Sequence, residues 1–176
     1  CKIAHEHGAL VLTDDAQFAP HHKMDMQQSG VDFSAFSIHK MCGPTGIGVL
    51  FVRHDLYGEM DPFLVGGDTI KTVQIDNGQV ECKYLEPPEK YEAGLQNYAG
   101  AIGAGAAIDY LEGIGIEKIE EQERRLNKRL TEGLLGIKKI QLLGPTDYHE
   151  RGALTSFVVQ GIDSHDLARD LDTTAN

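Results

Sequence analysis

Two short clusters of polar side chains, each placed directly after an apolar run, are the residues of this sequence that could carry chemistry. They are Asp14, Asp15 and Gln17 in the first cluster, and Ser37, His39 and Lys40 in the second. Polar groups at the carboxyl ends of parallel strands converge on the crevice in which α/β proteins bind ligands. We therefore expect acid, amide, hydroxyl, imidazole and amine to meet at one ligand site, whereas either cluster alone would be typical of a polar loop.

The segments that carry these clusters alternate between strand and helix patterns. Three apolar, β-branched or aromatic runs predict strands, and the first is expected to be buried in a parallel sheet: residues 9–14, 31–37 and 47–53. Short strands such as TIKTVQI are expected within residues 61–88. An Ala- and Gly-rich helix is predicted over residues 96–113, and it needs tertiary support because glycine disfavours helices. Alternating strands and helices predict an α/β domain.

A second domain is predicted to begin near Gly113, where the pattern changes to a long helix followed by two strands and a helix. The long helix, residues 116–134, is expected to carry an apolar face with one polar exception, made of Ile116, Ile119, Glu123, Leu126, Leu130 and Leu134. The elements after it are predicted as two strands and a helix with Ser164 as its N-cap: residues 139–144, 153–160 and 164–171. The predicted domains are therefore residues 1–112 and 113–176.

Charge and composition argue against several classes of protein. The 176 residues contain 16 Lys and Arg against 27 Asp and Glu, which gives a formal net charge of −11. Nucleic acids and anionic membranes attract basic surfaces, so neither is an expected partner. No apolar run approaches the ~18 residues that indicate a transmembrane helix. Three cysteines do not form the pattern of a disulfide framework, and they fit a reducing, cytoplasmic compartment.

Residues 9–52 closely resemble the cofactor-lysine region of the cysteine desulfurases, which are pyridoxal-phosphate enzymes of the class V aminotransferase group. The resemblance rests on three motifs in order: Asp-x-Ala-Gln at 14–17, Ser-x-His-Lys at 37–40 and Gly-Pro-x-Gly-x-Gly at 43–48. The run HKMCGPTGIGVL is similar to the SUF-type branch. The resemblance implies the type I fold of pyridoxal-phosphate-dependent transferases, similar to aspartate aminotransferase. The chain would then hold the second half of the large domain and the beginning of the small C-terminal domain.

The resemblance also implies a role for most residues of the two clusters. Lys40 is implied to bind the aldehyde of the cofactor covalently and then to act as acid or base. Asp14 is implied to pair with the pyridine nitrogen, and Gln17 to hydrogen-bond the phenolic oxygen of the ring. Ser37 and His39 are implied to hold the phosphate. No metal ligand is implied.

The activity that the resemblance implies is removal of sulfur from L-cysteine, which gives L-alanine and a protein persulfide. The persulfide would pass to a sulfur acceptor or an iron–sulfur cluster scaffold protein, and the family implies a homodimer. None of Cys1, Cys42 and Cys82 matches the family's nucleophile, and Cys42 is interpreted as a packing residue. Leu95 replaces a Thr that in the family reaches the phosphate in the neighbouring subunit. The chain is interpreted as an internal piece of a longer protein.

Three alternatives stay beside this interpretation. A selenocysteine lyase or another class V enzyme would share the same motifs. A metal-binding protein is an alternative of a different class, in which acidic and imidazole side chains would be the ligands: Asp14, Asp15, His21, His22, His5 and His7. An inactive fragment is the third. A nucleotide-binding site is not predicted, because neither a GxxxxGK motif nor a GxGxxG motif before a helix is present.

Overall fold

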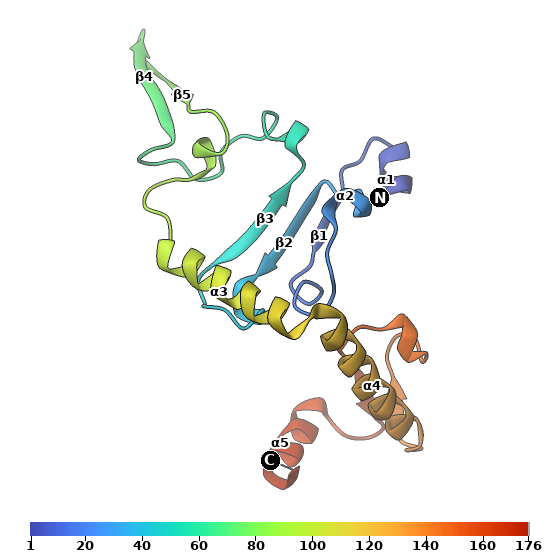
Figure 1. The fold of residues 1–176 in the computed structure, drawn as a ribbon. Coiled ribbons are helices and arrows are strands. Elements are labelled where there is room, and N and C mark those ends of the chain that lie inside the picture. Colours follow the sequence, from blue (N-terminus) through green and yellow to red (C-terminus); the bar gives the residue numbers. More distant parts are fainter. Residues whose placement is uncertain (176) are drawn as a thin grey trace. The chain divides into compact units, whose positions relative to one another are not determined.

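The computed structural model describes residues 1–175 and contains a three-stranded sheet (Figure 1). The two polar clusters lie at the carboxyl ends of two of its strands. The strands are β1 (Leu12–Asp14), β2 (Phe33–Ser37) and β3 (Gly48–Val52), in the spatial order β1-β2-β3. β1 and β2 are parallel, with Asp14 paired to Ala35, and β3 is antiparallel to β2. All three lie where the sequence predicts strands. Because β1 and β2 are parallel neighbours, their carboxyl ends lie side by side at the same end of the sheet.

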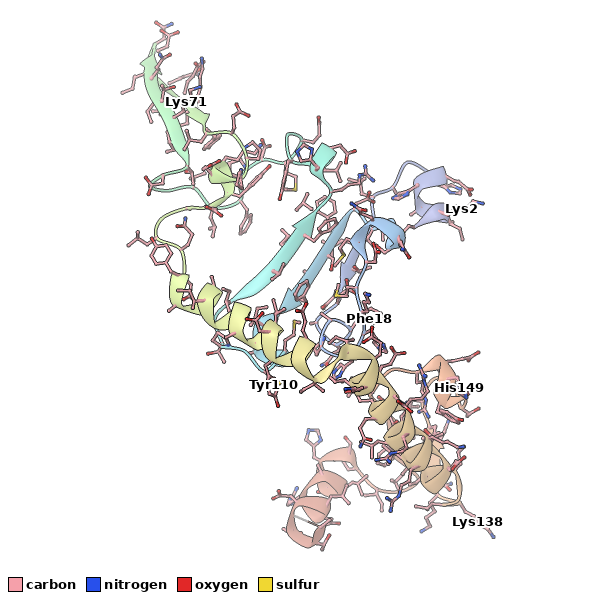
Figure 2. The ribbon with its side chains drawn as sticks, viewed as in Figure 1. Lys2, Phe18, Lys71, Tyr110, Lys138 and His149 are labelled. Atoms are coloured by element: carbon pink, nitrogen blue, oxygen red, sulfur yellow. The ribbon has the colours of Figure 1, made fainter. Side chains whose placement is uncertain are left out.

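The other elements up to residue 114 are helices, short 3-10 turns and a hairpin. They are α1 (Lys2–Glu6), α2 (Met26–Ser29), η1 (Ile38–Lys40), η2 (His54–Leu56), β4 (Ile70–Asp76), β5 (Gln79–Tyr84), η3 (Glu89–Tyr91) and α3 (Tyr98–Ile114). β4 and β5 form the hairpin, in which every residue of β4 is exposed (Figure 2). β4 matches the predicted strand TIKTVQI, whereas β5 is not singled out by the sequence analysis. The overlooked signal is Asn77-Gly78, whose φ angles of 49° and 82° suit a two-residue hairpin turn.

The chain from Ile114 onward forms a second unit, which also includes residues 21–23, and residues 1–20 and 24–113 form the first. The second unit contains α4 (Ile116–Leu135), β6 (Ile140–Leu142), η4 (Tyr148–Glu150), β7 (Phe157–Val159) and α5 (Ser164–Ala175), with β6 and β7 antiparallel. No helix among the described residues is long and apolar enough to cross a membrane. The assignment of residues 1–112 and 113–176 to the large and small domains of a longer protein stays a prediction.

The apolar face predicted for α4 is only partly covered by the described residues. Leu126 and Leu130 are 51% and 47% exposed, whereas the buried residues of the helix are Asn127 and Thr131. The amide of Asn127 donates to the carbonyl oxygen of Gly152 (2.8 Å), and its Oδ1 accepts from the hydroxyl of Thr131 (3.2 Å). Buried polar groups need such partners. The helix therefore packs through a hydrogen-bonded face that is offset by one residue from its apolar stripe.

The N-cap of α5 is Asp163, which corrects the prediction of Ser164. Oδ1 of Asp163 accepts a hydrogen bond from the backbone N–H of His165 (2.9 Å), and its carbonyl oxygen accepts from the N–H of Leu167 (2.9 Å). A carboxylate here caps free N–H groups and also interacts favourably with the positive end of the helix dipole. Ser164 is instead the first residue of the helix.

The first strand is not buried by the described residues, which corrects a second prediction. Leu12 is 61% exposed, and Leu50, on the same face of the sheet, is 57% exposed. The apolar pattern of the strand needs a cover that no described element provides. Among the described residues, the apolar core of the first unit lies elsewhere, in side chains from β3, η1, α3 and the loops on either side of α2: Ala19, Val31, Ile38, Val52, Ala104, Ala107 and Leu111.

Asp32 is fully buried and joins three segments of the first unit. Its Oδ2 accepts hydrogen bonds from His5 Nε2 (2.8 Å) and from the backbone N–H of Val11 (2.7 Å), and its Oδ1 is paired with Arg53. The hydrogen bond from His5 is the largest cause that lowers the pKa of Asp32 below its ordinary value of 3.8, and the Val11 N–H acts in the same direction.

This network predicts a loss of stability in acid. Because the pKa of Asp32 is lower in the folded than in the unfolded chain, its ionised form stabilises the fold above about pH 3.8, and this contribution disappears as the pH falls through the folded pKa. At pH values below about 3.8, we expect the urea concentration at the unfolding midpoint to decrease for the wild type. It should decrease less for Asp32→Asn, which has no carboxyl group to titrate at this position. Equal acid dependence in the two proteins would contradict this account.

Candidate active site

An open cavity of about 580 Å³ lies at the carboxyl ends of β1 and β2. Three residues of the predicted clusters, Asp14, Ser37 and Lys40, line it together with the surfaces of Ala16, Ala35, Phe36, Gly48, Val49 and Leu50. Carboxylate, hydroxyl and amine therefore meet at one site. Gln17 and His39 are exposed and do not line this cavity. The structure thus brings together three of the five residues to which the family resemblance assigns a role. The role of each residue stays a prediction.

The two adjacent aspartates make different contacts. Oδ1 of Asp14, at the end of β1, accepts a hydrogen bond from the backbone N–H of Ala16 (3.0 Å), which leaves Oδ2 available to a ligand. Asp15 does not line the cavity. Its Oδ2 accepts hydrogen bonds from the hydroxyls of Thr13 and Ser34, each at 2.6 Å, and thereby links β1 to β2. Asp14 is therefore the carboxylate presented to a ligand, and Asp15 is a structural one.

Lys40 is held by the short 3-10 turn η1 that follows β2. Ile38, at the start of this turn, is 1% exposed and anchors it in the core, while Lys40 is exposed. The carbonyl oxygen of Ile38 accepts hydrogen bonds from the N–H groups of Met41 (2.9 Å) and Gly43 (3.1 Å). Within residues 1–175, Lys40 forms no ion pair, so its amine is available to the cavity. The hydrogen-bonded turn is thus held in the core by the buried side chain of Ile38, and it presents the exposed amine of Lys40.

Cys42 is exposed, which corrects its interpretation as a packing residue. Its φ of 61° lies in the left-handed region, which side chains other than glycine rarely adopt. The residue reverses the chain two positions after Lys40, where a glycine would be unstrained. Nothing in the sequence indicates this conformation, because cysteine is not a residue that favours left-handed turns.

Replacing Cys42 by glycine is therefore expected to stabilise the protein. Relief of the left-handed conformation, about 1–2 kcal/mol, outweighs the added backbone entropy of glycine, about 0.5–1 kcal/mol, so the free energy of unfolding should rise by about 0.5–1 kcal/mol. Cys82→Gly is the matched control, because this exposed cysteine lies inside β5, where glycine weakens a strand. Urea unfolding should show opposite signs for the two variants, and the same sign would refute the strain at Cys42.

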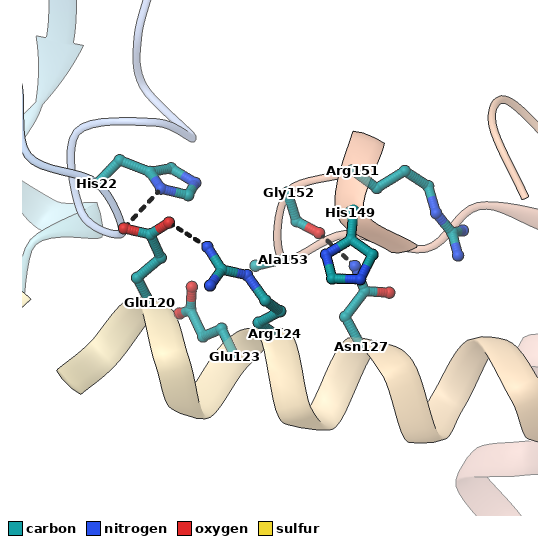
Figure 3. Close-up of a pocket in the computed structure, with 9 residues that line it drawn as sticks. All are labelled: His22, Glu120, Glu123, Arg124, Asn127, His149, Arg151, Gly152 and Ala153. Atoms are coloured by element: carbon teal, nitrogen blue, oxygen red, sulfur yellow. Dashed lines mark hydrogen bonds and ion pairs between the residues drawn. The ribbon is translucent and has the colours of Figure 1, made fainter. Parts of the chain in front are cut away.

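A second, smaller cavity of about 90 Å³ lies beside α4 within the second unit (Figure 3). Its lining is mostly charged or polar: His22, Glu120, Glu123, Arg124, Asn127, His149, Arg151, Gly152 and Ala153. Glu120 accepts a hydrogen bond from Arg124 (2.6 Å) and lies 3.7 Å from Nδ1 of His22. Glu120 is thus already paired on both sides, with Arg124 and with His22.

The imidazoles considered as metal ligands have other partners in the structure. His5 donates to Asp32, and His21 is hydrogen-bonded to Glu123. In the part of the chain that the structure describes, no group of three or more His, Cys, Asp or Glu residues is arranged to hold a metal ion. The metal-binding alternative therefore gains no geometric support.

The class of protein follows from the fold and from comparison with known families. The model of the family described as aminotransferase class-V matches the whole chain, residues 1–176. The chain belongs to this family. Its α/β architecture is that of the type I pyridoxal-phosphate-dependent transferases, as predicted.

Individual relatives are narrower in their description. A protein of Streptomyces coelicolor described as a probable cysteine desulfurase is 46% identical over 169 residues, which cover 96% of this chain and 40% of that protein. The apo structure of a cysteine desulfurase from Thermococcus onnurineus NA1 is 43% identical, with a TM-score of 0.87 over 98% of this chain and 42% of that one. The cysteine desulfurase CsdA of Escherichia coli is 35% identical, with a TM-score of 0.83 over 98% and 41%. The chain spans about 40% of the length of the curated relatives it matches.

Proposed function

We propose that this chain carries the lysine side of the pyridoxal-phosphate site of a cysteine desulfurase. The enzyme would remove sulfur from L-cysteine, release L-alanine and deliver the sulfur, as a protein persulfide, to an acceptor or scaffold protein for iron–sulfur cluster assembly. One observation carries the proposal: Asp14, Ser37 and Lys40, which come from two successive motifs at the ends of β1 and β2, line a single cavity. The similarity to cysteine desulfurases at 43–46% identity supports the choice of reaction within the family.

The residues of the cavity fit this cofactor. Its volume of about 580 Å³ lies within the usual range of ~300–1,000 Å³ for small-molecule sites. A carboxylate suits the pyridine nitrogen, a hydroxyl suits the phosphate, and a primary amine suits the aldehyde. When bound, the cofactor supplies an electron sink for negative charge that develops at the substrate Cα.

The residues of this chain then have separate tasks. Lys40 would hold the cofactor covalently through Nζ, and its amine would accept the proton from Cα of L-cysteine and return a proton to Cα of L-alanine. Asp14 holds a proton on the pyridine nitrogen through Oδ2, since Oδ1 is engaged by the N–H of Ala16. Ser37 donates its hydroxyl hydrogen to the phosphate. Gln17 and His39, which are exposed, are assigned to the phenolic oxygen and the phosphate.

Sulfur transfer needs a thiolate, which attacks the substrate sulfur so that an S–S bond forms as the substrate C–S bond breaks. Cys1, Cys42 and Cys82 are free and exposed, and none of them lines the cavity. We therefore assign the persulfide to a cysteine other than Cys1, Cys42 and Cys82. A homodimer and a cytoplasmic location complete the proposal, the latter because free exposed thiols suit a reducing compartment.

Reductive trapping tests the cofactor part of this proposal. The protein is incubated with pyridoxal phosphate, reduced with borohydride, digested and analysed by mass spectrometry. We expect the pyridoxyl adduct to concentrate on Lys40 and to disappear in Lys40→Ala, while Lys138→Ala, which removes a lysine of the second unit, leaves it unchanged. An adduct spread over the lysines of a folded protein would refute the assignment of Lys40.

A further inference from the structure

We propose that helix α3 positions Lys40, because it fixes the loop that follows this lysine, residues 41–46, at three points. The inference rests on the proposed function only in that Lys40 is taken as the lysine that binds the cofactor. Its geometric basis is independent of any ligand and lies entirely within the first unit. α3 has no direct contact role in the chemistry, so Gly43, Asn97, Gly103 and Ala107 are positioning residues.

The first point joins Gly43 to Ile38 and Ala107. A Cβ atom added at Gly43 would lie 2.3 Å from Cγ2 of Ile38 and 3.2 Å from Cβ of Ala107. Ile38 is 1% exposed and Ala107 6% exposed, so neither side chain has free space to move into. The φ angle of Gly43 lies outside the left-handed region, so the backbone conformation does not require a glycine here. The close approach to Ile38 and Ala107 is what requires it. The loop, η1 and α3 are thus in direct van der Waals contact.

Two further points continue the contact toward the start of α3. A Cβ added at Gly103 would lie 3.0 Å from Cγ of Pro44. Oδ1 of Asn97 caps the helix by accepting from the N–H of Gly100 (2.9 Å), and its Nδ2 donates to the carbonyl oxygen of Gly46 (3.3 Å). The loop therefore runs along α3. Gly43, Pro44 and Gly46 lie opposite Ala107, Gly103 and Asn97, which are four and six positions apart.

These contacts reach Lys40 through the backbone of η1. The carbonyl oxygen of Ile38 binds the N–H groups of both Met41 and Gly43, and the N–H of Ile38 donates to the carbonyl oxygen of Ile47 (3.3 Å) at the entry to β3. A shift of Gly43 away from α3 must therefore move the hydrogen-bonded turn that contains Lys40. Among the small residues of α3, Gly103 and Ala107 make this close approach, at Pro44 and Gly43.

Matched pairs of substitutions on α3 test the inference. Ala107→Leu enlarges a buried residue that faces Gly43, whereas Ala106→Leu enlarges its exposed neighbour. Gly103→Ala adds a methyl group against Pro44, whereas a Cβ at Gly105 meets nothing within 4 Å. Gly103→Ala and Gly105→Ala gain the same helix propensity, so they differ only in the contact with the loop, and this milder pair keeps the test valid if Ala107→Leu does not fold.

Two readouts are measured for each pair. The first is hydrogen exchange of the amides of Met41 and Gly43, which needs no cofactor. The second is the fraction of Lys40 trapped by borohydride at limiting pyridoxal phosphate, relative to the other lysines. We expect Ala107→Leu to speed the exchange and reduce the trapping by about tenfold, the effect of an overpacking cost of ~1.4 kcal/mol, and Gly103→Ala to change both in the same direction by about two- to threefold.

The outcomes separate the two proposals. If wild-type Lys40 is not trapped but the exchange differs between the members of each pair, the assignment of Lys40 to the cofactor fails while the positioning by α3 stands. If Lys40 is trapped equally in Gly103→Ala and Gly105→Ala, and the loop amides exchange equally, the positioning by α3 is refuted and the cofactor assignment stands. Global stability, measured by urea unfolding, should rise in Gly105→Ala and must not account for the difference at Lys40.

Discussion

If the proposed function is right, Lys40→Ala is expected to abolish the proposed desulfurase reaction with L-cysteine. The variant removes the amine that binds the cofactor and the group that moves the substrate proton, so the rate of L-alanine formation should fall by at least about 10³-fold, within the ~10²–10⁴ range of general acid–base catalysis alone. Lys40 is exposed at the end of η1, and truncation at Cβ leaves the buried anchor Ile38 untouched. The free energy of unfolding should therefore change little.

The decisive comparison is between Lys40→Ala and Lys40→Arg. Arginine keeps the positive charge and most of the length, but its guanidinium is not a nucleophilic amine. If Lys40 acts by covalent binding and proton transfer, both variants lose activity to a similar extent. If it acts only as a positive charge, Lys40→Arg retains most of the rate, and the assigned role is wrong. L-Alanine release from L-cysteine, measured at saturating cofactor, decides between the two.

The sheet and the cavity could be predicted from the sequence because their signals are local. Apolar runs that end in polar residues marked β1 and β2, and the parallel pairing of Leu12 with Phe33 brought their ends together as expected. The clusters themselves are less specific, because adjacent residues of one cluster point to opposite faces of a strand. The sequence could not separate Asp14, which lines the cavity, from Asp15, which bonds Thr13 and Ser34.

Features that depend on distant partners were outside the reach of the sequence. The buried face of α4 is set by the hydrogen bond from Asn127 to the carbonyl oxygen of Gly152, 25 residues away. The spacing of apolar residues along the helix does not indicate this contact. The glycines of α3 predict a helix of low intrinsic stability. Nothing in the local sequence indicates that Gly103 lies against Pro44. The left-handed φ of Cys42 is likewise set by the turn in which it lies and not by its own preference.

The two aspartates provide the second large expected effect. Asp14→Asn should reduce L-alanine formation by about 10- to 100-fold, because it replaces a charged hydrogen-bond partner of the pyridine nitrogen, an interaction that contributes roughly 1.5–3 kcal/mol. Asparagine can still accept the hydrogen bond from the N–H of Ala16 through Oδ1, so the end of β1 should keep its conformation. The loss should therefore appear in activity and not in the free energy of unfolding.

Asp15→Asn, one position along the chain, is expected to show the reverse. Its Oδ2 accepts hydrogen bonds from the hydroxyls of Thr13 and Ser34, each at 2.6 Å, and Ser34 is fully buried. The variant therefore weakens one hydrogen bond within the end of β1 and one to β2, and should lower the free energy of unfolding by about 1–2 kcal/mol. Activity at saturating cofactor should stay within about twofold of the wild type, since this carboxylate does not line the cavity. A greater loss of activity in Asp15→Asn than in Asp14→Asn would reverse the assignment. Because the two substitutions make the same chemical change at neighbouring positions, only the face of the strand distinguishes their effects.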